Sequence, residues 1–234
     1  YTYYVDSQPY GNTTISVTSL VSTASTTFFI TPAIVCVTPT SGTVGSQVTI
    51  LGNGYNAIQQ IVVYFGAGLP PSNGDNDYWW AQPPASTITT SNTNNAGTFT
   101  ALFTIDLQPY GTTTILARDV NNKFARNIFC IQPEVWIVPL FGTVGSSVTI
   151  KGNGYSKNTS LQINFGTTNN VGGVITTDNN GLFTTLFTIN TQRWGTTTLT
   201  ALGSGVSDMA VFKIEAVVTN VSPSSGIVGT TVLI

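Results

Sequence analysis

The segment from Pro39 to Tyr55 reads PTSGTVGSQVTILGNGY, and 100 residues later the segment from Pro139 to Tyr155 reads PLFGTVGSSVTIKGNGY. The opening part returns after a further 84 residues, from Pro223, as PSSGIVGTTVLI. A match of this length does not arise by chance, and self-similarity along a chain is typical of repeat architectures. The sequence therefore predicts tandem copies of one structural unit.

A second motif keeps the same spacing in the other half of each copy. It reads QPYGNTT from Gln8, QPYGTTT from Gln108 and QRWGTTT from Gln192, so the intervals are again 100 and 84 residues. Because two independent motifs agree on both intervals, the copies stay in register along the chain. The predicted organisation is a set of closing strands in residues 1–33, complete repeats in 34–133 and 134–216, and the opening strands of a further repeat in 217–234.

Within each copy, short stretches alternate apolar residues with Thr, Ser, Gln or Asn. Examples are Ser147–Ile150, Ser160–Phe165 and Thr197–Ala201, and turns such as Gly152–Gly154 and Asp178–Gly181 separate them. This period of two is typical of half-buried strands, and Gly and Asn readily adopt the positive φ of tight turns. The pattern predicts an all-β protein of tandem immunoglobulin-like Greek-key β-sandwich domains.

The pattern P-x-S-G-x-V-G-x-x-V-T-I-x-G-x-G-Y, read across the copies that begin at Pro39, Pro139 and Pro223, resembles the opening of IPT/TIG-type immunoglobulin-like domains. The resemblance implies a compact sandwich used for spacing and interaction in extracellular proteins. Tandem sets of this kind are similar to those in archaeal and bacterial surface proteins. It implies no catalytic residue and no particular ligand.

The composition narrows the possible functions. Charged residues make up 7% of the 234 residues, the formal net charge is −2, and histidine is absent. No basic stripe exists to neutralise phosphates, so nucleic acid is not expected as a partner. The longest apolar runs are far shorter than the roughly 20 residues that cross a bilayer, and no transmembrane segment is predicted in this stretch.

Catalysis has few candidate residues in this chain. The carboxylates stand singly, mostly at predicted turns or strand ends. Without histidine there is no Ser-His-Asp relay and no imidazole ligand for a metal. We therefore predict that the protein is not an enzyme, with no catalytic residue, metal site or cofactor.

The two cysteines, Cys36 and Cys130, fall on the predicted first and last strands of one repeat. In such sandwiches these strands can lie close together. We predict a disulfide between them, which would clasp the two ends of the domain and stabilise it by roughly 4 to 5 kcal/mol in the chain-entropy model. The alternative is a pair of buried free thiols.

The difference in length between the repeats falls largely in an insertion, residues 67–86, with the sequence AGLPPSNGDNDYWWAQPPAS. Asp75 and Asp77 offer carboxylate oxygens to a calcium ion, but the insertion lacks the spaced acidic series and final glutamate of an EF-hand. Calcium is therefore kept as an open alternative to the absence of any metal.

The aromatic residues of the insertion, Tyr78, Trp79 and Trp80, form the most distinctive group in the chain. Three interpretations stay open: they pack on their own sandwich, contact a neighbouring molecule, or stack on a sugar ring. Asn12, Asn158 and Asn220 each begin an Asn-x-Ser/Thr sequon and are predicted N-glycosylation sites of an exported protein.

These features predict a structural subunit or segment of an extracellular filament, stalk or surface layer, whose partners are copies of itself or adjacent repeats. Pairing between the opening strands of one subunit and the closing strands of another is part of this hypothesis, and its predicted residues are Val217, Val221, Val232 and Ile234. The alternative function is a cell-surface adhesin that recognises a glycan or protein through residues 67–86. A third is a non-catalytic spacer of an enzyme.

Overall fold

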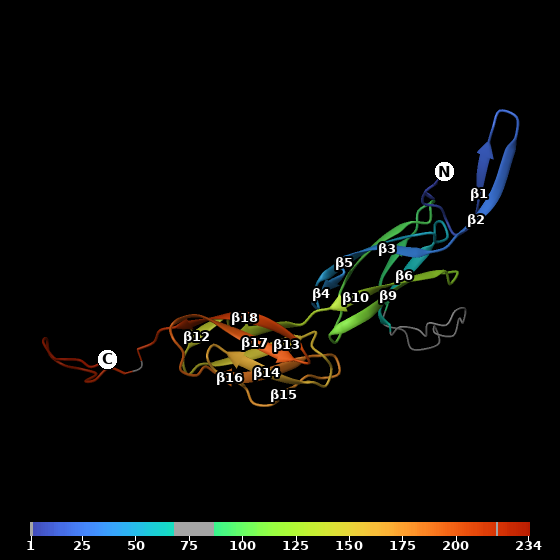
Figure 1. The fold of residues 1–234 in the computed structure, drawn as a ribbon. Helices are drawn as coiled ribbons and strands as arrows, with labels where there is room; N and C mark the ends of the chain where they lie inside the picture. Colours follow the sequence, from blue (N-terminus) through green and yellow to red (C-terminus); the bar gives the residue numbers. More distant parts are fainter. Residues whose placement is uncertain (1, 68–86, 219) are drawn as a thin grey trace. The chain divides into compact units, whose positions relative to one another are not determined.

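The computed structural model describes residues 2–67, 87–218 and 220–234, and the regular structure of these residues consists of β-strands. The predicted all-β class is confirmed. Among the described residues, no helix is long and apolar enough to cross a membrane. The chain divides into two compact units, Tyr1–Gln132 and Pro133–Ile234, which we call unit 1 and unit 2 (Figure 1).

Unit 1 holds a two-stranded ribbon followed by a two-sheet sandwich. The sandwich pairs β3-β5-β8 in one sheet and β4-β10-β9-β6-β7 in the other, which matches the immunoglobulin pattern A-B-E and A′-G-F-C-C′. Its strands are β1 (Gly11–Thr18), β2 (Thr23–Ile30), β3 (Ala33–Thr38), β4 (Ser41–Gly42), β5 (Gln47–Asn53), β6 (Gln60–Ala67), β7 (Thr87–Asn92), β8 (Phe99–Thr104), β9 (Gly111–Asp119) and β10 (Phe124–Ile131).

Unit 2 repeats the sandwich strand for strand. Its sheets are β11-β13-β16 and β12-β18-β17-β14-β15, in the same order as those of unit 1. Its strands are β11 (Glu134–Val138), β12 (Phe141–Thr143), β13 (Ser147–Asn153), β14 (Ser160–Phe165), β15 (Ile175–Thr176), β16 (Phe183–Thr188), β17 (Gly195–Gly203) and β18 (Val206–Glu215).

The alternating pattern of the sequence builds one apolar core in each unit. In β5 and β13 every second residue is buried, because successive side chains of a strand point to opposite faces of its sheet. Phe65 packs edge-on against Phe129 in unit 1, with ring centroids 5.8 Å apart, and Phe165 packs in the same way on Phe212 in unit 2, at 5.6 Å. Both of these pairs lie within one sheet, and the contact between the sheets is made by Phe65 with Phe103 at 5.3 Å and by Phe165 with Phe187 at 5.2 Å.

Each core also contains the tyrosine that ends the GNGY motif. Tyr55 and Tyr155 are fully buried, and each ring packs edge-on against a phenylalanine, Phe99 or Phe183. The Tyr55 hydroxyl donates a hydrogen bond to the carbonyl of Ala117 at 3.2 Å. The Tyr155 hydroxyl has no hydrogen-bond partner among the described residues. The hydroxyl of this motif tyrosine is thus hydrogen-bonded in unit 1 and unpaired in unit 2.

This difference predicts opposite effects of the same substitution. Tyr55→Phe is expected to lower the free energy of unfolding of unit 1 by about 1 kcal/mol, because it removes a buried hydrogen bond. Tyr155→Phe is expected to leave unit 2 unchanged or to stabilise it slightly, because it removes a buried polar group that has no partner. Urea unfolding of the two variants measures both effects, and equal losses would contradict this account.

Burial raises the pKa of both tyrosines above the ordinary value of 10.0, and the carboxylates of Asp119 and Asp208 add to the shift in Tyr55 and Tyr155 respectively. A tyrosine whose pKa is higher in the folded state makes its full contribution to the free energy of unfolding below about pH 10. This contribution is lost as the pH rises above about 10, because the unfolded chain ionises first. We expect the free energy of unfolding to fall above about pH 10, by up to about 1.4 kcal/mol per pH unit for each tyrosine. Unfolding measured across this range should show a smaller slope for the double variant Tyr55→Phe, Tyr155→Phe.

Candidate functional site

The ribbon of β1 and β2, residues 11–30, is called the closing hairpin here. Gly11 lies opposite Ile30, just as Gly111 lies opposite Ile131 in unit 1 and Gly195 opposite Ile214 in unit 2. The three glycines also share the same φ of 119°. The closing hairpin therefore has the structure of the last two strands of a complete repeat.

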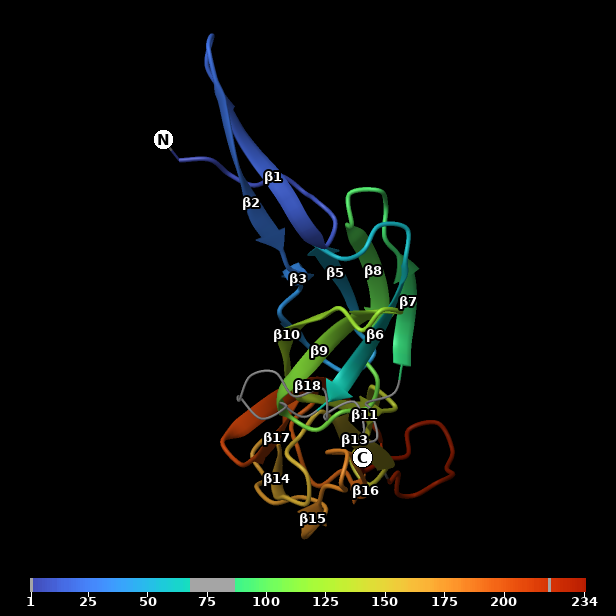
Figure 2. The ribbon, with the colours of Figure 1, turned by 90° about the vertical axis from the view of Figure 1, so that its right-hand side faces the viewer.

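The closing hairpin exposes a face that complete repeats bury. Its residues Ile15, Val17 and Phe28 occupy the positions of Ile115, Ala117 and Phe129, which are among the most buried residues of unit 1. Val17 is 72% exposed and Phe28 is 44% exposed. Figures 1 and 2 show the ribbon extending away from the other strands of unit 1. An apolar sheet face is thus left without a covering sheet among the described residues.

The base of the closing hairpin is fixed to the sandwich of unit 1. The Tyr10 backbone N–H donates to the carbonyl of Tyr55 at 2.9 Å, and the Tyr10 ring lies edge-on to Phe29 at 5.2 Å. The ammonium group of Lys123 sits 4.4 Å from the centroid of the Tyr10 ring. Ile30, the last residue of β2, is buried. These contacts hold the hairpin in place while its face stays exposed.

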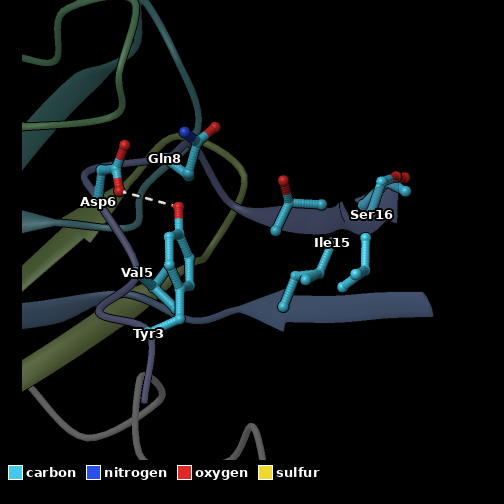
Figure 3. Close-up of a pocket in the computed structure, with 9 residues that line it drawn as sticks. Tyr3, Val5, Asp6, Gln8, Ile15 and Ser16 are labelled. Carbon is cyan, nitrogen blue, oxygen red and sulfur yellow. Dashed lines mark hydrogen bonds between the residues drawn. The ribbon is translucent and has the colours of Figure 1, made fainter. Parts of the chain in front are cut away.

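A groove of about 430 Å³ runs between the N-terminal segment and β1 (Figure 3). Tyr3, Val5, Asp6 and Gln8 line one side, and residues 13–17 line the other. The Tyr3 hydroxyl donates to Asp6 Oδ1 at 3.2 Å, and the negative charge of Asp6 raises the pKa of this hydroxyl. The groove is lined by successive residues of β1 and mixes apolar and polar side chains.

The opposite end of the chain, residues 217–234, is called the opening segment here. Ser222 and Leu233 exchange two backbone hydrogen bonds, of 2.9 and 2.8 Å, in the register that pairs Thr38 with Thr49 in unit 1. The Thr230 N–H also donates to the carbonyl of Ile227 at 3.0 Å, as Ser46 does to Thr43 at 3.1 Å. The opening segment has therefore begun the first hairpin of a repeat.

The predicted pairing residues of the opening segment are all exposed. Val217, Val221, Val232 and Ile234 have exposed fractions of 52%, 43%, 45% and 82%. By the repeat spacing, Val232 and Ile234 correspond to Val48 and Ile50, whose exposed fraction is zero. Both ends of the chain thus present core-type side chains to solvent.

The predicted disulfide is not formed in the structure, where Cys36 and Cys130 are free thiols. Cys36 belongs to β3 and Cys130 to β10, which lie in different sheets, and the ladder places Cys130 opposite Ser41. A register shift between Ile34 and Cys36 also leaves Cys36 on the exposed side of its strand. The alternative of two buried free thiols is correct in the free state and wrong in the burial, because Cys36 is exposed and Cys130 is half-buried.

The three predicted glycosylation sites lie at the surface. Asn12 is on β1, Asn158 is in a turn with a φ of 50°, and Asn220 is in the opening segment, and all three are exposed. The Asn158 side chain donates to Asn179 Oδ1 at 2.8 Å. Their exposure is compatible with modification, which stays a prediction.

The residues predicted for the insertion, Asp75, Asp77, Tyr78, Trp79 and Trp80, lie outside the described residues. Within the described part of the chain, no group of acidic, cysteine or histidine side chains could hold a metal ion. The buried carboxylate of Asp119 is used by a turn, since its Oδ1 accepts the backbone N–H groups of Asn121 and Lys123. This carboxylate has a structural role.

The fold and its exposed strand faces define the class: tandem immunoglobulin-like β-sandwich proteins. No protein-family model matches the chain, and no curated protein matches it. Among solved structures, the Yersinia pseudotuberculosis adhesin InvE is 13% identical, with a TM-score of 0.32, over 80% of this chain and 58% of that one. The Escherichia coli adhesin FdeC is 11% identical, with a TM-score of 0.30, over 80% of this chain and 64% of that one.

A structure of invasin, described as a bacterial integrin-binding protein, is 17% identical, with a TM-score of 0.32, over 81% of this chain and 40% of that one. The chain thus spans about three fifths of the length of the first two structures and less of the third. At these values the likeness is one of β-sandwich architecture. It transfers no ligand or partner to this chain.

Proposed function

We propose that the chain is a structural segment of an extracellular filament, stalk or surface layer, in which immunoglobulin-like repeats are joined end to end. One observation carries the proposal: the closing hairpin and the opening segment both keep the strand register of complete repeats while exposing side chains that complete repeats bury. Such ends are stabilised by contact with further strands, because burial removes apolar surface from water. The closing hairpin and the opening segment are therefore suited to contact with further strands.

The strands on offer cover only part of a repeat. The closing hairpin has the structure of strands F and G, and the opening segment has that of strand A and the start of strand B. Strands C, C′ and E have no further copy among the described residues outside the two sandwiches. Joining two ends therefore produces a partial sandwich, and further strands would complete it.

The proposal is tested by electron microscopy of material isolated from the source cells, with intact-mass analysis of the denatured chains. We expect long fibres or a lattice. Chains near 24.7 kDa plus glycan would mean separate subunits joined through their ends, and a much larger chain would mean a continuous array. Dispersed particles with no fibre or lattice would rule out the structural role.

The alternative is a cell-surface adhesin that binds a glycan or protein through residues 67–86. It is favoured by one observation: this proline-rich, aromatic insertion is present in the first repeat and absent from the second. Deletion of residues 73–80 separates the two functions. Loss of ligand binding with intact assembly would support the adhesin, and loss of assembly would support the filament.

A further inference from the structure

We propose that β2 of one copy pairs in parallel with residues 225–226 of a second copy, with Phe29 opposite Ser225 and Ile30 opposite Gly226. This inference rests on the proposed function and specifies the joint between subunits. The partner is the opening segment of a second copy of this chain. The pairing adds a strand to the free edge of the closing hairpin, which is a common mode of peptide recognition by sheets.

The register follows from the two complete repeats, where the last strand pairs in parallel with a short strand near the start. In unit 1, β10 pairs with β4, and Cys130 and Ile131 lie opposite Ser41 and Gly42. In unit 2, β18 pairs with β12, and Lys213 and Ile214 lie opposite Phe141 and Gly142. When the repeats are aligned, the residues equivalent to both pairings are Phe29 opposite Ser225 and Ile30 opposite Gly226.

The hydrogen bonds of the joint follow from the same equivalence. In unit 1, the Cys130 N–H donates to Thr40 at 3.1 Å and the Gln132 N–H donates to Gly42 at 2.9 Å. In unit 2, the Lys213 N–H donates to Leu140 at 3.0 Å. The corresponding bonds of the joint run from Phe29 to the carbonyl of Ser224 and from Thr31 to the carbonyl of Gly226.

In both complete units, the glycine of the short parallel strand faces a phenylalanine ring of the last strand. A Cβ added at Gly42 would lie 3.5 Å from the ring of Phe129, and one at Gly142 would lie 3.4 Å from the ring of Phe212. At Gly226 the three nearest atoms to an added Cβ belong to Thr230 alone. Phe28 has the position of these two rings, so its side chain fits against Gly226 of the second copy.

The apolar faces are complementary in the same way. In unit 1, Val48 and Ile50 share one core cluster with Ile115 and Phe129. In unit 2, Val148 and Ile150 share one with Leu199 and Phe212. The joint would bring together Val232 and Ile234 from one copy with Ile15 and Phe28 from the other. Each side would cover apolar side chains that the other leaves exposed.

Cysteine trapping tests the register directly. Phe29→Cys and Ser225→Cys are introduced together into the full chain, in which Cys36→Ser and Cys130→Ser remove the native thiols. Cα atoms more than about 7 Å apart cannot be bridged, so the trap reports direct neighbours. We expect oxidation to give a ladder of linked chains on a non-reducing gel. The matched control combines Thr27→Cys with Ser225→Cys, two residues out of register, and is expected to link at least about tenfold less.

Two outcomes would overturn the inference and leave the proposed function standing. One is equal linking by the control pair, and the other is no linking while sedimentation shows the same association as the parent chain. A disulfide closed within a single chain, detected as an oxidised monomer by mass, would exclude a second copy as the partner. Absence of both linking and association would contradict subunit pairing as a whole.

Discussion

Replacing Gly181 by alanine is expected to lower the free energy of unfolding of unit 2 by about 3 kcal/mol or more. Gly181 has a φ of 75°, and an added Cβ would lie 2.0 Å from the carbonyl oxygen of Tyr155. Since that oxygen belongs to the backbone, relief of the clash requires the turn at Gly181 to move away from Tyr155. The Tyr155 N–H donates to the Gly181 carbonyl at 3.2 Å, and this bond would be lost with the movement.

A matched control separates the clash from the backbone conformation. Gly205 has a similar φ of 78°, but no atom lies within 4 Å of an added Cβ. Gly205→Ala is expected to cost only about 1 to 2 kcal/mol, the ordinary penalty for a left-handed residue. Urea unfolding of both variants gives the comparison. Equal costs would mean that the turn at Gly181 does not pack on Tyr155 as described.

The second large effect concerns association. Phe28→Asp is expected to weaken the self-association of the chain at least about a hundredfold, because it removes a large apolar side chain and places a charge on the buried face of the joint. Unit 1 should keep its stability, since Phe28 is 44% exposed in the single chain. Sedimentation velocity over a range of concentrations measures the loss.

Thr27→Asp is the control for this prediction. Thr27 lies on the same strand and points to the opposite face, at the positions of Ile128 and Val211, which are exposed in the complete units. It adds the same charge without entering the joint. If both variants associate as weakly as each other, the effect comes from charge alone and the apolar face is not the contact.

The repeat was the part of the structure most open to prediction from sequence. The motifs that begin at Gln8 and Pro39 identified the copies, and the alternation around Ser147–Ile150 predicted strands that the structure contains. The alternation of apolar and polar residues and the turn residues between strands are local signals, because each is set by the geometry of a few neighbouring residues. The all-β sandwich class was therefore accessible from the sequence.

The sequence could not show that Cys36 and Cys130 stay unbonded. Whether two cysteines can form a disulfide depends on how strands of different sheets are placed, which the sequence pattern does not give. Placing Cys36 and Cys130 on the first and last strands of a repeat was correct. The sequence did not reveal the register shift beside Cys36. In unit 2 the corresponding strand has no such shift, and Val135 and Ile137 alternate regularly toward the core.

The candidate site was only half predicted. Val232 and Ile234 were named from the sequence, whereas Ile15, Val17 and Phe28 on the facing strands were not. The signal was present, since the repeat spacing aligns Ile15 with Ile115 and Val17 with Ala117. The alignment becomes informative once the structure shows that Ile115 and Ala117 are buried in unit 1, whereas Ile15 is half-buried and Val17 exposed.

Sedimentation equilibrium of the unmodified chain tests the central claim most directly, which is that the opening segment of one copy pairs with the closing hairpin of another. We expect a weight-average mass that rises steadily above 24.7 kDa as the concentration increases, because each association leaves one closing hairpin and one opening segment unpaired. A constant mass of 24.7 kDa across the accessible concentrations would contradict it.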